Sequence, residues 1–179
     1  MKRWALLCGI MLLSAAAASG QGAPKVEVFG GYSYVHTSVS GTDFTANLNG
    51  GSASVSINPT SWLGLVGDFG GYHGGVNSLG SGINGQIYTY MFGPKSSFRL
   101  GKVTPFIQTL FGGVHASAGS VYGSENAFAM ATGGGIDWNA TEHLGVRLIQ
   151  AEYLLTMLND GANNRQNSAR ISAGIVFRW

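Results

Sequence analysis

The chain has 179 residues, of which 10 are Lys or Arg and 8 are Asp or Glu, so charged residues make up only 10% of it. Soluble domains usually carry about 25% charged residues, and this composition therefore argues against an ordinary water-soluble protein. A chain with a net charge of +2 and no basic stripe is also not expected to bind nucleic acid.

The first 20 residues have the pattern of a secretory signal peptide. Lys2 and Arg3 precede an apolar run at 4–13 and a small-residue stretch at 14–20. The apolar run is too short to span a membrane as a helix, which takes about 20 residues. We expect cleavage after residue 18 or 20, with residues 21–179 forming one mature domain. Cys8 is the only cysteine and leaves with the leader, so neither disulfides nor a thiol nucleophile are expected.

Eight segments beyond the leader alternate apolar with small or polar residues over roughly ten positions, which is typical of strands in a transmembrane β-barrel. They are Val26–His36, Gly51–Asn58, Leu63–Tyr72, Ile83–Gly93, Val103–Ala116, Ala127–Trp138, Leu144–Thr156 and Ser168–Trp179. We therefore predict an all-β fold, namely an eight-stranded antiparallel up-and-down transmembrane β-barrel.

The predicted connections alternate in length along the chain. Those at 58–62, 94–102 and 139–143 are relatively short, whereas those at 37–50, 73–82, 117–126 and 157–167 are mostly longer and rich in Gly, Ser and Asn. Short periplasmic turns and long outer loops are typical of outer-membrane barrels. With an even number of strands, this pattern predicts that both termini lie in the periplasm.

Charged residues inside the predicted strands occupy the face opposite to the apolar residues. Glu27, Asp68 and Arg170 do so directly, whereas Arg147 and Glu152 need a β-bulge near Leu148–Ile149 to share one face with Gln150. A charge that faces lipid at mid-membrane costs roughly 2–4 kcal/mol, so these side chains should point inward. The predicted lumen network is Glu27, Asp68, Arg147, Glu152 and Arg170.

Closure of the barrel makes the first and last strands neighbours, so Glu27 and Arg170 form the candidate ion pair. An eight-stranded barrel has an interior just wide enough for side chains to fill. We therefore predict a mostly closed lumen, in which glycines inside strands, such as those at 30–31 and 133–135, provide space.

Three tryptophans fall at strand ends on the predicted periplasmic side, namely Trp62, Trp138 and Trp179. Trp favours the membrane–water boundary, which predicts an interface role for all three. The last strand places Ile171, Ala173, Ile175, Phe177 and Trp179 on one face. It resembles the closing strand of bacterial outer-membrane barrels, whose final aromatic residue belongs to a signal read by the assembly machinery. The resemblance implies an assembly signal at Ile175, Phe177 and Trp179.

Several further segments extend this resemblance over roughly Val26 to Trp179. They are the opening Val26–Tyr34, Pro105-Phe106, Gly133–Asp137 and Arg147–Tyr153. Together they resemble the small, porin-like outer-membrane β-barrel family that includes the membrane domain of outer-membrane protein A. The resemblance implies an outer-membrane location in a Gram-negative bacterium, contact with lipid, and assembly by periplasmic chaperones and the barrel assembly machinery. We expect a monomer without cofactors.

Motifs for chemistry are weak. Residues 80–85 match a dinucleotide fingerprint, but the residues after them alternate as a strand, so we interpret the motif as an outer loop. His36, His73 and His115 lie near predicted outer strand ends without metal-site spacing. His36, Ser38 and Asp43 are the residues that a rim-site lipid-modifying enzyme would use. We predict no catalytic activity and a structural envelope role with surface loops, adhesion included. The alternatives are a narrow porin for small solutes and then the rim enzyme.

Overall fold

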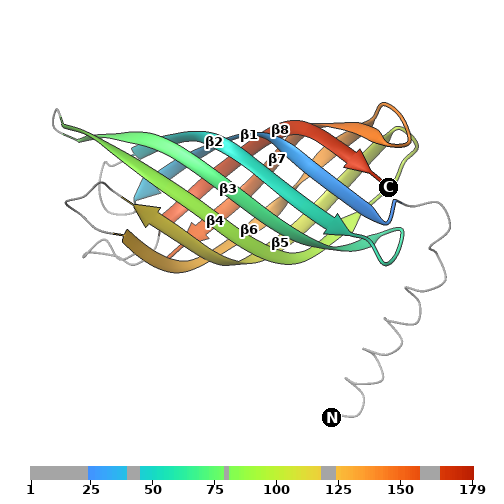
Figure 1. Ribbon diagram of the computed structural model, residues 1–179, viewed down its shortest axis with the longest axis horizontal. Helices are drawn as coiled ribbons and strands as arrows, with labels where there is room; N and C mark the ends of the chain where they lie inside the picture. Colours follow the sequence, from blue (N-terminus) through green and yellow to red (C-terminus); the bar gives the residue numbers. More distant parts are fainter. Residues whose placement is uncertain (1–23, 40–44, 79–80, 118–123, 158–165) are drawn as a thin grey trace, which may run out of the picture.

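The computed structural model describes residues 24–39, 45–78, 81–117, 124–157 and 166–179. The strands are β1 Val26–Val39, β2 Thr45–Ile57, β3 Leu63–Ser78, β4 Ser81–Ser97, β5 Val103–Ser117, β6 Ser124–Asn139, β7 Leu144–Thr156 and β8 Gln166–Arg178. Each is antiparallel to its neighbours, and β1 pairs with β8, so the sheet closes into a barrel (Figure 1). This confirms the predicted fold. The predicted leader lies outside the described residues.

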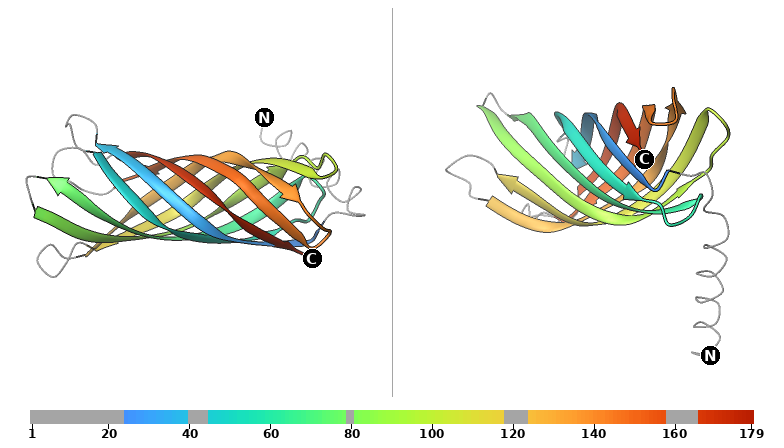
Figure 2. Two further views of the ribbon diagram at one scale, coloured as in Figure 1. Left: turned by 90° about the horizontal axis from the view of Figure 1, so that it is seen from above. Right: turned by 45° about the vertical axis from the view of Figure 1, so that its right-hand side comes forward.

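The strands run obliquely along the barrel, and both views of Figure 2 show their common tilt. Tilt is what allows a twisted sheet to close on itself. The first strand begins beside the last residue, since the backbones of Val26 and Trp179 exchange hydrogen bonds of 3.1 and 2.9 Å. We call this end of the barrel the termini end; the β2–β3, β4–β5 and β6–β7 turns also lie there. The opposite end is called the loop end.

Strands extend further toward the loop end than the apolar alternation predicts. The β3–β4 register continues to Ser78↔Ser81, and the β1–β2 register continues to Ser38↔Thr45. The prediction of long loops at 37–50 and 73–82 is therefore wrong, as is the interpretation of residues 81–85 as a loop. Ladder hydrogen bonds come from the backbone, so Gly-, Ser- and Asn-rich segments continue a strand even where the side-chain pattern stops. The connecting residues at this end mostly lie outside the described ones.

At the termini end, β4 continues through Pro94 to Ser97, although we predicted its end at Gly93. Proline has no N–H for the ladder. The β4–β5 register accordingly runs from the loop end to Phe92↔Phe111 and resumes at Lys95↔Gln108. The pairing of β4 with β3 is continuous here and carries the strand past the proline. As a result, Lys95 belongs to a strand rather than to a turn, and its side chain is buried inside the barrel.

The predicted bulge in β7 is confirmed. The β7–β8 register shifts between Arg147 and Gln150, and the β6–β7 register shifts opposite it, between Ile136 and Asp137. The extra residue leaves both Leu148 and Ile149 on the exterior, while Arg147 and Gln150 are buried. One inserted residue thus keeps Arg147, Gln150 and Glu152 on the inner face.

The barrel is apolar outside and largely polar inside. Large side chains such as Leu65, Phe69 and Phe92 are 62–70% exposed on the exterior. In a water-soluble protein such side chains would be buried, so this surface suits hydrocarbon. The described part of the chain contains no helix that is long and apolar enough to cross a membrane.

Candidate functional site: the charged interior of the barrel

Eight charged side chains with at most 4% exposure meet inside the barrel. They are Glu27, Asp68, Lys95, Asp137, Arg147, Glu152, Arg170 and Arg178. Four are acidic and four are basic, so their formal charges cancel. We call this set the charged network. All five residues of the predicted lumen network belong to it.

One half of the charged network, which we call the termini-end cluster, is centred on Glu27 and Asp137. Glu27 accepts from Lys95 Nζ at 2.7 Å, and its other carboxylate oxygen lies 3.2 Å from both Arg99 Nη2 and Arg178 Nε. Arg178 also reaches Asp137 through Nη2 at 3.0 Å. Arg178 therefore bridges the two carboxylates and links β1 to β6 through the end of β8.

Arg147 completes the termini-end cluster. Its Nε and Nη2 donate to the two oxygens of Asp137 at 2.8 and 3.2 Å, which is the bidentate geometry that Arg favours with carboxylates. The guanidinium also lies between two rings, 4.3 Å from the centroid of Phe29 and 4.4 Å from that of Phe106. Two cation–π contacts and a bidentate ion pair compensate this cation for its lost hydration.

Glycines leave space for these two rings. A Cβ added to Gly135 would lie 2.5 Å from the carbonyl oxygen of Ile149 and 2.8 Å from Cζ of Phe106. One added to Gly174 would overlap the carbonyl oxygen of Gly30 and lie 2.9 Å from Cε2 of Phe29. All four distances are too short for real Cβ contacts, so a side chain here would meet both a neighbouring strand and a ring. The expectation that strand glycines serve a crowded lumen is confirmed at these positions.

The second half of the charged network, the mid-barrel cluster, is centred on Arg170. Its Nη1 donates to Asp68 Oδ1 at 2.7 Å, and its Nε and Nη2 lie 2.7 and 2.6 Å from Glu152 Oε2. Arg170 therefore connects β3 with β7, and the hydroxyl of Tyr72 lies 3.2 Å from its Nη1. Two carboxylates share one guanidinium here.

Two glutamines complete the arrangement. Gln108 Nε2 donates to Glu152 at 2.8 Å. Gln150 accepts from Arg147 Nη1 at 2.6 Å and donates to Glu152 at 2.7 Å. Gln150 therefore joins the termini-end cluster to the mid-barrel cluster, and the hydrogen-bonded chain is continuous from Glu27 to Asp68. Such a chain is strong only when every member is satisfied.

Apolar side chains fill much of the rest of the interior. This apolar plug consists of Val35, Leu48, Val66, Tyr72, Met91, Leu110, Val114, Ala129, Ala131 and Leu154. Leu110 and Val114 are completely inaccessible to solvent. Tyr72 belongs to both regions, since its ring packs in the plug while its hydroxyl meets Arg170.

The predicted pair of Glu27 and Arg170 is wrong. The β1–β8 register sets Glu27 opposite Arg178 and sets Arg170 opposite Val35. Because the two strands are antiparallel, the second residue of β1 meets the last residue of β8, and Arg170 lies eight positions further along. The predicted adjacency of the two strands is confirmed, but adjacency alone does not set their register.

Sequence reasoning also missed Lys95, Asp137, Arg178 and the half-buried Arg99. A signal was present for two of them, because Asp137 alternates with Ile136 and Trp138, and Arg178 lies between Phe177 and Trp179. Lys95 was hidden by the turn that Pro94 suggests. Arg99 belongs to the β4–β5 turn, from which its Nη1 also donates to the carbonyl of Ser61.

The rim residues form no comparable site within the described part of the chain. His36 and His115 are near the loop end, and each ring is hydrogen-bonded through Nδ1 to an asparagine of the next strand, Asn47 or Asn126. No group of three potential metal ligands occurs among the described residues. Of the residues considered for a rim enzyme, Asp43 and the side chain of Ser38 lie outside the described ones.

The three tryptophans and the last residues of β8 lie at the termini end. Trp62 precedes β3, Trp138 lies near the end of β6, and Trp179 follows β8; all three are 40–62% exposed. Ile175 and Phe177 are also exposed on the exterior. The rings of Phe177 and Trp179 stack with centroids 6.3 Å apart.

Comparisons with known proteins agree with this architecture. The family described as outer membrane protein beta-barrel domain matches residues 5–178. No curated protein matches the chain. Among solved structures, Neisserial surface protein A aligns with a TM-score of 0.71 at 15% identity, covering 89% of this chain and 100% of that one.

Two further solved structures have the same fold. OprG from Pseudomonas aeruginosa aligns with a TM-score of 0.60 at 10% identity, covering 89% of this chain and 98% of its own. Ail, the attachment invasion locus protein of Yersinia pestis, aligns with a TM-score of 0.58 at 18% identity, covering 88% of this chain and 99% of its own. At such identities the likeness concerns the fold alone.

Proposed function

The chain belongs to the outer membrane protein β-barrel domain family, and we propose that it serves the outer membrane as a closed structural barrel without catalytic activity. The observation that carries this proposal is the filled interior. The charged network and the apolar plug together fill the lumen, and their central members, Arg170 and Leu110, have no solvent exposure. Water and ions would therefore have to pass both paired charges and packed apolar side chains, which are two different barriers to conduction.

Planar-bilayer recording tests the proposal against the alternative of a narrow porin. The purified barrel should give no large, steady conductance. A matched variant, Leu110→Asp, places a carboxylate in the plug and should admit water there without changing the exterior. Steady conductance from the wild-type protein would favour the porin.

We propose that residues 1–20 direct export and are cleaved, that the termini lie in the periplasm, and that the barrel is a monomer. The placement of the short turns at the termini end supports this orientation. Protease added to intact cells should cut at the loop end, within residues 40–44 or 158–165. Cleavage confined to the turn at 98–102 would mean the opposite orientation.

We further propose that Ile175, Phe177 and Trp179 form a signal for periplasmic chaperones and the barrel assembly machinery, and that Trp62, Trp138 and Trp179 mark the periplasmic membrane boundary. Their exposure at one end of the barrel supports both roles. The variant Trp179→Asp should accumulate unassembled in the periplasm, whereas Trp62→Asp, at the same end but outside the last strand, should assemble more nearly normally. Normal outer-membrane levels of Trp179→Asp would contradict the proposed signal.

A second candidate function is attachment to an external partner. Beyond His73 and Gln86, β3 and β4 continue as a pair from Gly74↔Gly85 to Ser78↔Ser81, whereas among the described residues their registers with β2 and β5 end at His73 and Gln86, with Gly74 still lying against Leu48 of β2. Edges of this kind favour pairing with another strand, and residues 74–85 contain neither charge nor proline to discourage it. Ail, which has a similar fold, is named as an attachment protein.

Deletion of residues 75–84, with a two-residue turn joining the strands, tests attachment. The shortened barrel should keep its stability and lose binding of cells that express it to host surfaces. If binding survives the deletion, the β3–β4 extension is not the attachment surface.

A further inference from the structure

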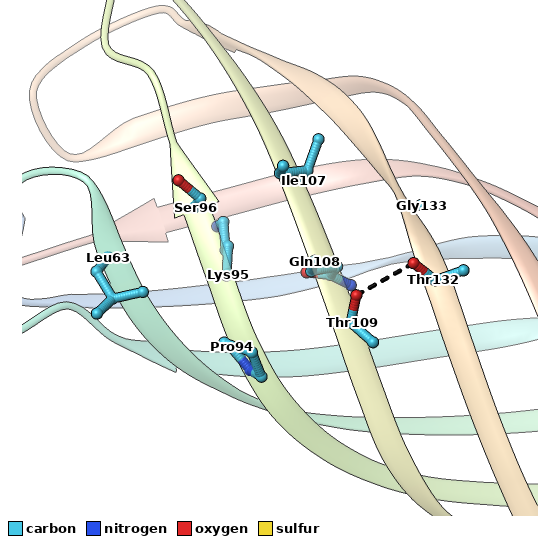
Figure 3. A pocket seen from close by; sticks show the side chains of 9 residues that line it. All are labelled: Leu63, Pro94, Lys95, Ser96, Ile107, Gln108, Thr109, Thr132 and Gly133. Carbon is cyan, nitrogen blue, oxygen red and sulfur yellow. Dashed lines mark hydrogen bonds between the residues drawn. The ribbon is translucent and has the colours of Figure 1, made fainter. Parts of the chain in front are cut away.

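A groove interrupts the exterior of the barrel in the half nearer the termini end. It has a volume of about 450 Å³. Six exterior residues from β3, β4, β5 and β6 line this wall groove (Figure 3): Leu63, Pro94, Ser96, Ile107, Thr109 and Thr132. Its floor includes the strand segments of Lys95 and Gln108, whose side chains end inside the barrel at Glu27 and Glu152.

The groove has a local cause in the sequence. Pro94 provides no N–H to β5, and the β4–β5 pairing is interrupted between Phe92↔Phe111 and Lys95↔Gln108. On the termini-end side of this break, the exterior side chains of Ser96, Thr109 and Thr132 are short. The hydroxyls of Thr109 and Thr132 hydrogen-bond to each other at 3.1 Å, as Figure 3 shows, instead of extending over the gap. Because the two hydroxyls partner each other, they are tolerated on a lipid-facing wall.

We propose that the wall groove binds one acyl chain of a phospholipid, whose phosphate lies beside Lys102 at the termini end. The groove is continuous with an exterior that faces hydrocarbon, and an unfilled space there would lose dispersion contacts on both sides. Leu63, Pro94 and Ile107 give it apolar walls that a flexible chain fits. Under the proposed orientation, on which this assignment of the leaflet rests, the lipid belongs to the periplasmic leaflet.

The mouth of the groove at the termini end has side chains that suit a lipid headgroup. Trp62 precedes Leu63 and is 40% exposed, and its ring suits the depth of the headgroups. Lys102 is exposed in the β4–β5 turn, directly before Val103. Ile107 lies four positions after Val103 on β5, a rise of about 13 Å, so a chain in the groove places its headgroup near the lysine. An ammonium beside an anionic phosphate also favours this orientation of the lipid.

A photoreactive phosphatidylglycerol with a diazirine on one acyl chain tests the proposal in vesicles of phosphatidylglycerol and phosphatidylcholine. After irradiation, peptide mapping of the mature barrel should find labels concentrated on Pro94–Ser96 and Ile107–Thr109. Thr132→Phe fills the groove and should reduce this labelling to the level of the rest of the exterior. Ala53→Phe, an even larger addition on the exterior of β2, should leave it unchanged.

A second variant tests the proposed contact between Lys102 and the lipid phosphate. Lys102→Gln should weaken labelling by phosphatidylglycerol about fivefold, since one lysine near the membrane surface is worth about 1 kcal/mol, whereas Lys25→Gln at the same end should not. If Thr132→Phe fails to fold, Thr132→Leu is the substitute.

Two results would overturn the proposal. Uniform labelling around the wall would mean ordinary lipid contact, and labelling replaced by protein–protein crosslinks at high protein density would mean that a second copy occupies the groove. Vesicles offer the lipid in both leaflets, so these results do not depend on the orientation or on the conductance of the barrel.

Discussion

Toward the termini end, the barrel interior holds eight buried charges and the glutamines that join them, whereas toward the loop end it holds Val35, Leu48, Val114 and Leu154. Both regions exclude water, but they do so by different physics. The charged network depends on each member having its partner, because a buried charge without one is very costly. The apolar plug depends only on volume and packing, so each member contributes independently of charge.

The two regions are therefore vulnerable in different ways. Removal of one side chain from the charged network affects partners on several strands, since Arg170 alone connects β3, β7 and β8. Removal of one side chain from the plug leaves a cavity whose cost is local. The two halves should differ in the size of single-residue effects and in whether a second substitution repairs the first.

The largest effect is expected for Arg170→Ala. It leaves Asp68 and Glu152 buried without a cation, and loss of one partner from a buried ion pair costs about 3–5 kcal/mol. The free energy of unfolding, measured by urea titration of the barrel refolded in detergent micelles, should fall by that amount, and the barrel should leak ions in planar bilayers.

The matched control removes all the charges of this cluster together. Arg170→Met combined with Asp68→Asn and Glu152→Gln leaves no buried carboxylate without a cation, and Lys95, Arg147 and Arg178 keep their contacts with Glu27 and Asp137, so it should be more stable than Arg170→Ala. Equal stability of the two would show that Arg170 acts through its bulk rather than its charge.

Much of this arrangement was predictable from the sequence, because a strand places neighbours on opposite faces. Glu27, Asp68 and Arg170 were assigned to the interior on this ground, and the bulge followed from the conflict between Arg147 and Glu152. The partners were not predictable in the same way. Lys95 reaches Glu27 across the lumen from β4, and such a contact depends on the tilt and stagger of all eight strands.

The second effect in size is expected in the plug. Leu110→Ala should lower the free energy of unfolding by about 2–5 kcal/mol, toward the lower end if the neighbouring side chains relax into the space. The control is Ile107→Ala on the same strand, which is 60% exposed on the exterior and leaves no closed cavity. A similar loss in both variants would mean that the plug is not closely packed.

Strand ends were the least predictable feature, and the reason is physical. The alternation of apolar and polar residues reports where the exterior meets hydrocarbon, but the backbone ladder continues beyond it through Gly74 and Gly85. At the other end of the barrel Pro94 had the same effect, because a residue typical of turns lies within a strand that its pairing with β3 holds in place.

A third and smaller effect tests the packing around the charged network. Gly135→Ala places a Cβ 2.5 Å from the carbonyl oxygen of Ile149 and 2.8 Å from the ring of Phe106, which faces Arg147, so both the β7 backbone and the ring must shift. Overpacking of this kind costs about 1–3 kcal/mol. Gly67→Ala is the matched control, since a Cβ there meets nothing within 4 Å. Comparable urea midpoints for the two variants would contradict the role assigned to Gly135.

The smallest effect is expected at Tyr72, where the two halves meet. Tyr72→Phe keeps the ring in the plug and removes only the hydroxyl that lies 3.2 Å from Arg170 Nη1. Because Asp68 holds the same nitrogen at 2.7 Å, the free energy of unfolding should fall by about 0.5–1.5 kcal/mol, the usual net value of one hydrogen bond.

Double-mutant cycles then measure how far the charged network and the apolar plug depend on each other. Tyr72→Phe should couple with Asp68→Asn, which shares its partner, and should add to Leu110→Ala within about 0.5 kcal/mol. Strong coupling to Leu110 instead would mean that the charged network and the apolar plug form one cooperative unit.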